Sequence, residues 1–569
     1  MARLRNATLT IREQLPPDLL YHLLKGEDDD ILTVIPAEAT AFSVIRNMES
    51  YSHKIDRIAE LMKLPAPRLL DKHSNIHRIP DGLNREGSLG WVKMPVPVAV
   101  FEFPGEKGDL FLIATTDFFK LIELLQPRPD GDLQRVTMIK ILADQPDSPA
   151  VERSGFAAPL GAFGAFAFEN DRNTLNNAVS DDSDIRSGLE PHGVWAADLD
   201  AYLMLTHEGL INGLQDFDIP FQTPLLQSAV SFIQTVAPLW LEKVDLLPDE
   251  WRPKQLSIGL AVDPDQGIAV RSRSWFSPDV DLTGVFSENP GGRELALKLL
   301  PDAPFLIALG GPISASQSQW ITSLPGQLAL PQKTLDIQIS SIQAVLLAPE
   351  PVQKNGEDLA RNIQNKGYFA FIPGLEGGLI FVVTVEDPEA ALEELETLFA
   401  ALKQQPSFFR IASTQKSKLG GITRLSVDLA LNGENYPIVR IAATGQKTLV
   451  FATGNDEQLA WTLDSLRENA NLSTSETIRA AVRMLPESTS WVAVVDLKNV
   501  VPLAISLYLG GLPEQQANEL LSLVGDMPLP LALGLSWQQS VLDVDLSLPK
   551  ETLPFIGRIL SFLAPWLTQ

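Results

Sequence analysis

The chain has 569 residues, of which 45% are hydrophobic and 20% charged, so it can bury the cores of two large domains or of about three to five smaller ones. Acidic residues outnumber basic ones 71 to 45, and the net charge of −26 lacks the basic footprint of nucleic-acid binding and disfavours anionic membrane surfaces. The absence of cysteine excludes disulfides, thiolate nucleophiles and cysteine metal sites, and no apolar stretch reaches the ~18 residues of a membrane-spanning helix.

The start of the chain is predicted to form a helical extension. Residues 19–24 have the apolar composition of a short helix, and the acidic run at 27–30 lacks the alternating ligand spacing of a calcium loop, so we expect an exposed turn there. The first residues are basic, but the apolar run of a signal peptide does not follow. The absence of cysteine suits an oxidising compartment. We therefore expect a periplasmic or extracellular location if a leader has been removed, and a cytoplasmic one otherwise.

Histidine occurs in the first half of the chain alone, at His22, His53, His73, His77, His192 and His207. The spacing of His73 and His77 would place two metal ligands on one face of a helix. However, Asn75 lies between them, Pro80 follows closely, and the glutamate of a zinc-protease helix is missing. The sequence therefore predicts a polar loop and no metal site.

An internal repeat is the most informative pattern in the sequence. Residues 97–125 are predicted to form a strand, a short turn, a second strand and a helix, and residues 368–399 have the same pattern. Four more pairs of segments match in the same order along the two halves: 34–45 with 299–309, 164–171 with 449–456, 194–199 with 493–497, and 256–260 with 531–535. These matches predict two tandem homologous halves, 1–285 and 286–569, which meet near the stretch 287–293 that contains Pro and Gly.

Each half is predicted to be α+β, with a mixed or mostly antiparallel sheet and covering helices. Short turns such as Asp263-Pro-Asp-Gln-Gly267 lie between successive strands, and such turns favour β-hairpins. A doubly wound parallel sheet is the alternative.

Two loops match functional motifs in part. Residues 263–267 imitate the start of a calcium loop but lack the acidic residue at its twelfth position. Residues 443–448 imitate the end of a phosphate-binding loop, but Arg440 and Gln446 stand where glycines are required. The sequence has no Gly-x-Ser-x-Gly elbow, and nothing in it singles out a Ser-His-Asp triad. We therefore predict no catalytic residue and no cofactor.

Two apolar segments are candidates for binding. Residues 155–168 interleave small residues with phenylalanines and carry no charge, which predicts a buried strand preceded by a close-packed loop or, alternatively, the lining of an apolar ligand cavity. The C-terminal residues 553–566 predict a 14-residue apolar helix that is too short to span a bilayer. Because Arg558 is its one charge, we expect this helix to pack on protein and not on a membrane surface.

Two sets of side chains are predicted to be structural. Phenylalanines in the predicted strands should line sheet faces, with alternate residues on opposite sides: Phe101, Phe103, Phe111, Phe166, Phe168, Phe369, Phe371, Phe381 and Phe451. Polar residues that recur where a strand precedes a helix should cap helices: Asn170, Asp198, Asp387, Asn455 and Asp496.

A hydrophobic pair followed by proline and then by a strand occurs three times, at Val34-Ile-Pro36, Leu299-Leu-Pro301-Asp302 and Met484-Leu-Pro486-Glu487, and Asp198 and Asp496 fit the same pattern at predicted strand ends. With these features the chain resembles a domain-of-unknown-function family of exported envelope proteins from planctomycetes and cyanobacteria. The resemblance implies an exported, non-enzymatic protein, and it assigns no functional residue.

The sequence as a whole favours a non-catalytic binding or structural protein associated with the cell envelope, whose partner is a protein, a glycan or an apolar small molecule. One alternative is a carrier of an apolar small molecule or lipid that uses residues 155–168. A second alternative is a hydrolase whose site lies in the first half, around His73, His77, His192 or His207.

Overall fold

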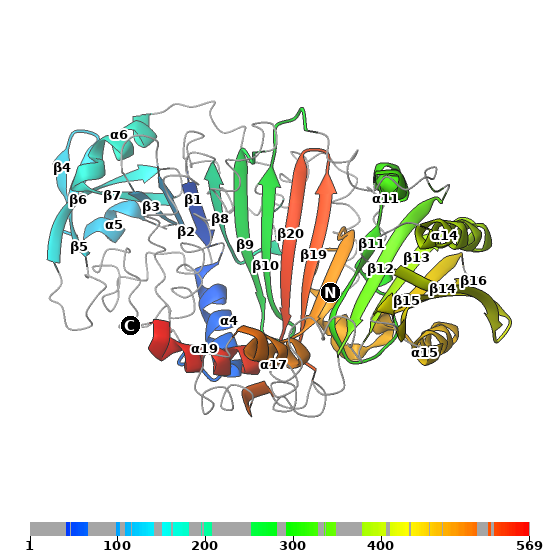
Figure 1. Cartoon of the computed structure of the whole chain (residues 1–569). Helices are drawn as coiled ribbons and strands as arrows, with labels where there is room; N and C mark the ends of the chain where they lie inside the picture. Colours follow the sequence, from blue (N-terminus) through cyan, green and yellow to red (C-terminus); the bar gives the residue numbers. More distant parts are fainter. Residues whose placement is uncertain are drawn as a thin grey trace. The chain divides into compact units, whose positions relative to one another are not determined.

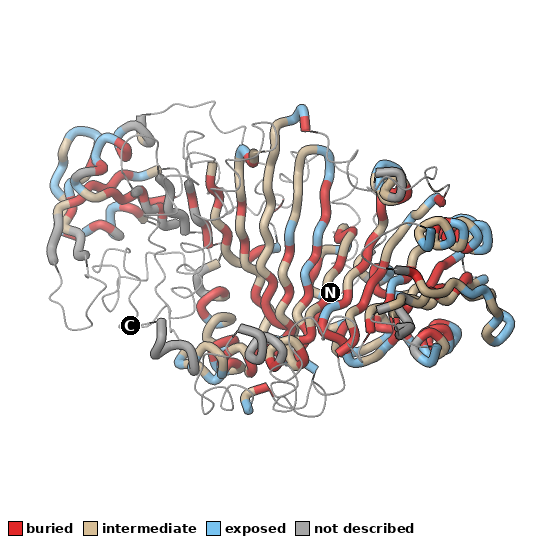
Figure 2. Tube along the Cα trace, in the orientation of Figure 1, coloured by how far each residue is buried: buried red, intermediate tan, exposed pale blue. Residues whose placement is uncertain are grey.

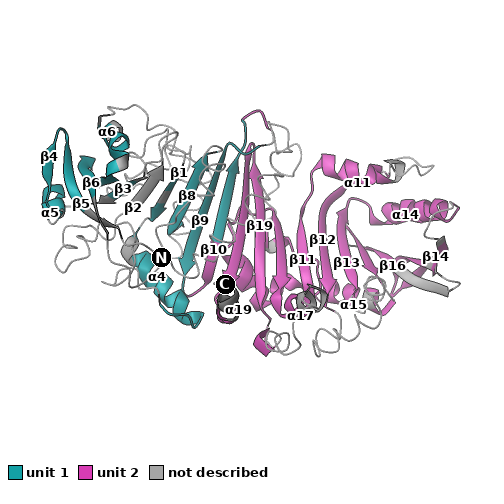
Figure 3. Ribbon diagram, turned by 60° about the vertical axis from the view of Figure 1, so that its left-hand side comes forward, with its two compact units in different colours: residues 1–264, 270–277, 564–569 teal, residues 265–269, 278–563 magenta. Residues whose placement is uncertain are grey.

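The computed structural model divides into two compact units (Figure 3). Unit 1 comprises Met1–Pro264, Val270–Ser277 and Ala564–Gln569, and unit 2 comprises Asp265–Ala269 and Pro278–Leu563. Along the chain, unit 1 is therefore followed by unit 2 within residues 264–278, before the expected boundary at 285. The structure describes residues 41–45, 47–66, 98–102, 109–114, 117–123, 125–140, 151–160, 163–180, 195, 198–206, 252–280, 292–327, 335, 337–348, 378–404, 410–431, 434–445, 447–453, 456–468, 470–508, 522–524 and 528–567.

Unit 1 contains an antiparallel sheet whose hydrogen-bonded order is β4-β5-β6-β7-β3-β2-β1-β8-β9-β10 (Figure 1). The strands are β1 (Ala41–Ile45), β2 (Val98–Glu102), β3 (Asp109–Ala114), β4 (Arg128–Asp130), β5 (Leu133–Lys140), β6 (Val151–Leu160), β7 (Phe163–Phe168), β8 (Ala201–Thr206), β9 (Gln255–Asp263) and β10 (Gly267–Trp275); residues 270–275 of β10 belong to unit 1. The helices are α4 (Met48–Leu61), α5 (Phe118–Glu123), the 3₁₀ turn η3 (Glu169–Asp171) and α6 (Arg172–Ser180).

In unit 2 the strands pair antiparallel in the hydrogen-bonded order β14-β15-β16-β17-β13-β12-β11-β18-β19-β20. The strands are β11 (Phe305–Pro312), β12 (Ile339–Leu347), β13 (Leu379–Val385), β14 (Arg410–Leu419), β15 (Ile422–Leu431), β16 (Glu434–Thr444), β17 (Thr448–Thr453), β18 (Trp491–Asp496), β19 (Pro530–Gln538) and β20 (Val541–Pro549). The helices are α10 (Gly292–Leu295), α11 (Ala315–Gln327), α14 (Pro388–Lys403), α15 (Asp456–Arg467), η8 (Leu472–Thr474), α16 (Glu476–Arg483), α17 (Leu497–Tyr508) and α19 (Leu553–Leu567); residues 553–563 of α19 belong to unit 2.

The two units have the same strand order, because each strand of unit 2 takes the place of the strand numbered ten lower in unit 1. Within each unit the paired strands run antiparallel and helices pack on them. The fold class is therefore α+β, as the hairpin turns predicted, and the doubly wound parallel alternative is wrong.

Most of the predicted segment matches fall on strands at equivalent places in the two orders. The segments 110–116 and 379–385 overlap β3 and β13, and the segments 256–260 and 531–535 lie in β9 and β19, the first strands of the hairpins β9–β10 and β19–β20. One match is wrong: within 194–199 the described residues are not in a strand, because Trp195 is helical and Asp198 lies in a 3₁₀ turn, and β8 starts at Ala201. Residues 368–373 lie outside the described residues, and β12 takes the place in unit 2 that β2 has in unit 1.

In unit 2, β16 and β17 are buried on both faces. On one face Ile441 and Leu449 pack against α14, where Leu392 is fully buried. On the other face Val450 packs in a cluster with Leu459 and Leu463 of α15. Figure 2 shows the buried residues along these strands and the exposed residues on the outer sides of both helices. Helix cover on both faces explains the continuous apolar run of β17, which has lost the alternation of a half-exposed strand.

In unit 1, the segment 155–168 forms the hairpin β6–β7 and not a strand preceded by a loop. Phe156, Phe163 and Phe166 are each at most 2% exposed. The Arg172 guanidinium of α6 lies 4.9 Å from the ring centre of Phe156 and closes one side of the hairpin. The segment is therefore a close-packed part of the core of unit 1, which leaves the apolar-carrier alternative without its proposed lining.

The predicted phenylalanines differ in burial. Phe166 is fully buried, Phe168 and Phe451 are half-buried, and Phe381 is 38% exposed. Phe101 lies in β2 and Phe111 in β3, but their side chains are outside the described part of the structure. Residues 103, 369 and 371 lie outside the described residues altogether. Placement in strands was thus predicted correctly where it is described, and Phe381 is the one exposed side chain among the four that are described.

The first part of the C-terminal helix α19 packs on other elements of unit 2, in agreement with the predicted packing on protein. Phe555 is 2% exposed and lies in a cluster with Val524 and Leu529, with Leu497 and Val501 of α17 against it. Among the described residues, no helix is long and apolar enough to cross a membrane.

Candidate binding pocket

A pocket of about 310 Å³ lies in unit 2, where four chain segments meet. These segments are the start of β11, the turn from η8 into α16, the junction between β18 and α17, and the start of β19. The lining combines carboxylates, hydroxyls and an amide with three prolines and a phenylalanine: Asp302, Ala303, Pro304, Phe305, Ser475, Thr477, Ile478, Asp496, Lys498, Asn499, Pro528 and Pro530. Its volume is at the lower end of the range for small-molecule sites.

Asp496 is the most constrained polar side chain of the pocket. It is 5% exposed and lies where β18 ends and α17 begins. Its Oδ1 accepts hydrogen bonds from the backbone N–H groups of Leu529 at 2.9 Å and Lys498 at 3.1 Å. Its Oδ2 accepts from Nδ2 of Asn499 at 2.9 Å, and the same Nδ2 lies 2.9 Å from the backbone oxygen of Phe305. The carboxylate thus joins the starts of β11, α17 and β19.

Both carboxyl groups of the pocket have raised pKa values. Burial raises the pKa of Asp496, and the backbone N–H groups of Leu529 and Lys498 and the charge of Lys498 offset part of this effect. Partial burial likewise raises the pKa of Asp302. In both groups, therefore, the surroundings disfavour the ionised form relative to water.

Lowering the pH is expected to relieve this cost. Because the folded-state pKa values lie above the unfolded ones, the folded protein binds protons more readily between the two, and its stability rises as the pH falls through the folded pKa. The free energy of unfolding of the wild type, relative to that of Asp302→Asn, should therefore increase as the pH is lowered from 7.5 to 4.5. Urea titrations at several pH values measure this difference. The control is Asp464→Asn on α15, whose side chain is exposed, and its free energy of unfolding should change with pH as that of the wild type does. The expectation would be contradicted if the free energies of unfolding of Asp302→Asn and of the wild type changed with pH in parallel.

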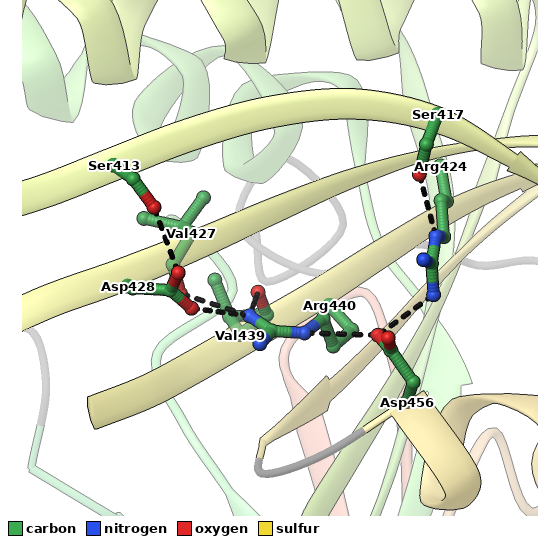
Figure 4. A network of polar contacts seen from close by, with 8 residues as sticks. All are labelled: Ser413, Ser417, Arg424, Val427, Asp428, Val439, Arg440 and Asp456. Atoms are coloured by element: carbon green, nitrogen blue, oxygen red, sulfur yellow. Dashed lines mark hydrogen bonds and ion pairs between the residues drawn. The ribbon is translucent and has the colours of Figure 1, made fainter. Parts of the chain in front are cut away.

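A second group of charged side chains lies on β14–β16 and the start of α15 (Figure 4). Nη1 of Arg440 donates to Oδ1 of Asp428 at 2.9 Å, and its Nε donates to Oδ1 of Asp456 at 3.1 Å. Arg424 forms an ion pair with the same oxygen of Asp456 at 2.7 Å, and its Nε donates to Ser417 Oγ at 2.7 Å. These charges are paired with one another, so the network ties α15 to the sheet.

The predicted helix caps have different outcomes. Asp387 caps α14, because its Oδ1 accepts from the backbone N–H of Ala390 at 3.1 Å. Asp496 accepts from the first turn of α17 in the same way, but it also contacts Leu529 and Asn499. For Asp198 the prediction is wrong: β8 follows it and not a helix, and its Oδ2 pairs with Nη1 of Arg271 at 2.7 Å.

The other two predicted caps are Asn170 and Asn455. Asn170 lies inside η3, so it does not precede that turn as a cap would. Asn455 lies outside the described residues.

The candidate functional motifs of the sequence lie away from the pocket. Residues 263–267 form the predicted hairpin turn from β9 into β10, and residues 443–448 contain the turn between β16 and β17. His53 is an exposed residue of α4, and the other five histidines lie outside the described residues. In the described part of the chain, no group of three His, Cys, Asp or Glu side chains could hold a metal ion.

Sequence reasoning did not identify the pocket, although it singled out two of its carboxylates. Asp302 belongs to the repeated hydrophobic-pair-and-proline motif, and Asp496 was assigned to helix capping. The structure brings both to one pocket because β11 and β18 are hydrogen-bonded neighbours. The only sequence signal for these two residues was that their motif recurs along the chain. This recurrence did not indicate whether a carboxylate lines a pocket or caps a helix.

Comparison with known proteins adds little to this geometry. No family model matches the chain, and no curated protein matches it. Three solved structures of TP0453 align with it: crystal form I over 44% of this chain and 79% of its own, with 12% identity and a TM-score of 0.22; form IV over 43% and 79%, with 10% and 0.21; and form III over 47% and 98%, with 10% and 0.24. At these scores the alignments support no conclusion about function.

Proposed function

We propose that the protein is a non-catalytic binding protein, and that the pocket of unit 2 holds a small molecule with a cationic group. The observation that carries the proposal is the presence of two carboxylates, Asp302 and Asp496, on the wall of one pocket of about 310 Å³. The lining includes one cationic side chain, Lys498, so the carboxylates outnumber it.

Electrostatics support a cationic group. The surroundings disfavour the ionised forms of Asp302 and Asp496, as their raised pKa values indicate. An ammonium group that enters the pocket would stabilise these ionised forms, because an opposite charge within a few ångströms offsets the loss of water. The binding of such a group should therefore be stronger at neutral pH than in acid.

The other walls support a ligand with a short hydrocarbon part. Phe305, Ile478 and three prolines supply apolar surface, whereas Ser475 and Thr477 supply hydroxyls. Polar groups placed beside apolar surface are typical of a site that fixes the orientation of a small molecule. Asp496 suits the role of a fixed anchor better than proton transfer, because three donors hold its oxygens in place.

The proposal is tested with n-butylamine and its neutral analogue n-butanol. Chemical shifts of the full-length protein, titrated at pH 7.5, should report saturable binding of the amine and weaker binding of the alcohol. Asp302→Asn should weaken amine binding about tenfold, which corresponds to about 1.4 kcal/mol. Asp464→Asn, whose side chain is exposed on α15, should bind as the wild type does. Equal binding of the two probes, or amine binding unaffected by Asp302→Asn, would overturn the proposal.

We also propose that the two units arose by duplication of one unit. The shared order of ten strands supports this proposal, as do the sequence matches at β1 and β11 and at β3 and β13. We further propose the cell-envelope location that the family resemblance implies. Fractionation of the source cells tests this location.

A further inference from the structure

One face of the unit 2 sheet carries an uninterrupted row of apolar side chains across six strands. Residues directly opposite one another in paired strands point to the same face of a sheet. The registers place Phe381, Ala344, Leu309, Ala493, Leu533 and Leu546 in one such row, from β13 to β20. In the next row Leu535 of β19 lies opposite Val544 of β20.

Five apolar residues of this face are exposed, whereas Ala344 is 5% exposed. Ile307, Phe381, Leu533, Leu535 and Val544 are 37–40% exposed, and we call the surface that these five residues form the open face. The alternate residues of the same strands are covered: Val494, Ala532 and Val382 are fully buried on the opposite side, in the cluster that contains residues of α15 and α16. From β13 to β20, therefore, one side of the sheet is covered and the other carries the open face, whereas over β16 and β17 α14 covers this second side as well.

The chemistry of the open face restricts its partner. The row and its neighbour contain no charged residue, so the partner surface must also be uncharged where the two touch. An anionic lipid surface is disfavoured, because the chain has a net charge of −26 and membrane-surface elements carry Lys and Arg beside their apolar residues. A sheet face of aliphatic side chains, in contrast, matches another such face, since two sheets pack about 10 Å apart with interleaved side chains.

The size of the open face also matches a second copy of the chain. The five exposed side chains offer roughly 300–400 Å² and their half-buried neighbours about as much again, so two copies face to face would bury on the order of 1,200–1,600 Å². This area lies within the usual range for specific protein interfaces. The same patch on both partners gives a closed two-fold contact. We propose that the open face is the interface of a homodimer.

Analytical ultracentrifugation of the full-length chain tests the proposal. The wild type should sediment as a dimer at about 10 µM, and Leu533→Glu, which places a charge in the middle of the apolar row, should weaken dimerisation at least 100-fold. The matched control is Trp461→Glu, because Trp461 is 39% exposed but lies on α15, which packs against the opposite face of the sheet. This control should remain dimeric.

A cross-linking measurement keeps the test independent of whether Leu533→Glu folds. Because the chain has no cysteine, Val544→Cys introduces a single thiol on the open face and Trp461→Cys a single thiol on α15. A short bis-maleimide should join two copies of Val544→Cys and leave Trp461→Cys uncross-linked. A wild type that is monomeric at 100 µM overturns the proposal, and so does a dimer that Leu533→Glu leaves intact. A monomer that co-sediments with phosphatidylcholine vesicles would overturn it and assign the face to lipid.

Discussion

Replacing Phe166 with alanine is expected to lower the free energy of unfolding by about 3–5 kcal/mol. The side chain of Phe166 is fully buried in β7, and β7 lies between β6 and β3. Alanine removes the apolar area that the ring takes out of water and leaves a cavity that the surrounding hairpin cannot fill. Urea titration followed by circular dichroism measures the loss.

The control for this experiment is a phenylalanine in the same unit whose side chain reaches solvent. Phe119 of α5 is 65% exposed, so Phe119→Ala should change the free energy of unfolding by about 0.5 kcal/mol or less. Similar losses for the two variants would show that β7 is not a central strand of the unit 1 core.

Replacing Asp496 with alanine is expected to lower the free energy of unfolding by about 2–4 kcal/mol. The backbone N–H of Leu529 and Nδ2 of Asn499 would lose their bonds to the carboxylate in a buried place. A buried donor without an acceptor costs about 1–3 kcal/mol, and the relief of a buried charge offsets part of the sum.

Asp387 provides the matched control, because it also precedes a helix but makes a cap contact on the surface. Its carboxylate accepts from Ala390 at 3.1 Å, in an exposed position, so Asp387→Ala should cost about 1 kcal/mol. Thermal unfolding of the two variants side by side measures the difference. Equal losses would mean that Asp496 acts as a cap alone and does not join β19 and β11 to the helix.

Hairpins were the most predictable part of the fold, because their turns and both strands lie close together in the sequence. The hairpins β9–β10 and β19–β20 illustrate this, since short polar turns join them. The segment 194–199 shows the limit. Its apolar residues Trp195 and Leu199 are at most 9% exposed, yet they pack as core residues ahead of β8 and not as a strand. A short apolar run indicates burial, but it does not distinguish a strand from a buried turn.

The pocket was less predictable than the fold, because its walls come from distant parts of the chain. Asp302 and Asp496 are brought together by the pairing of β11 with β18, and no local pattern encodes that pairing. The raised pKa values depend on burial, which is a property of the assembled sheet and helices. The sequence could therefore indicate which polar residues recur, but not which of them share a cavity.

The end strand of the unit 2 sheet bears on how copies of the chain can associate. Within the described part of the chain, β14 has β15 as its neighbour, and Gln415, Lys416 and Lys418 along it are exposed. Lys416 lies 3.4 and 3.5 Å from Glu393 and Glu396 of α14, which hold its charge beside the strand. Lysines on a sheet edge oppose the addition of a strand from another chain. Addition of a strand from another molecule is thereby disfavoured at β14, and the two-fold contact proposed for the open face would be closed by its own symmetry.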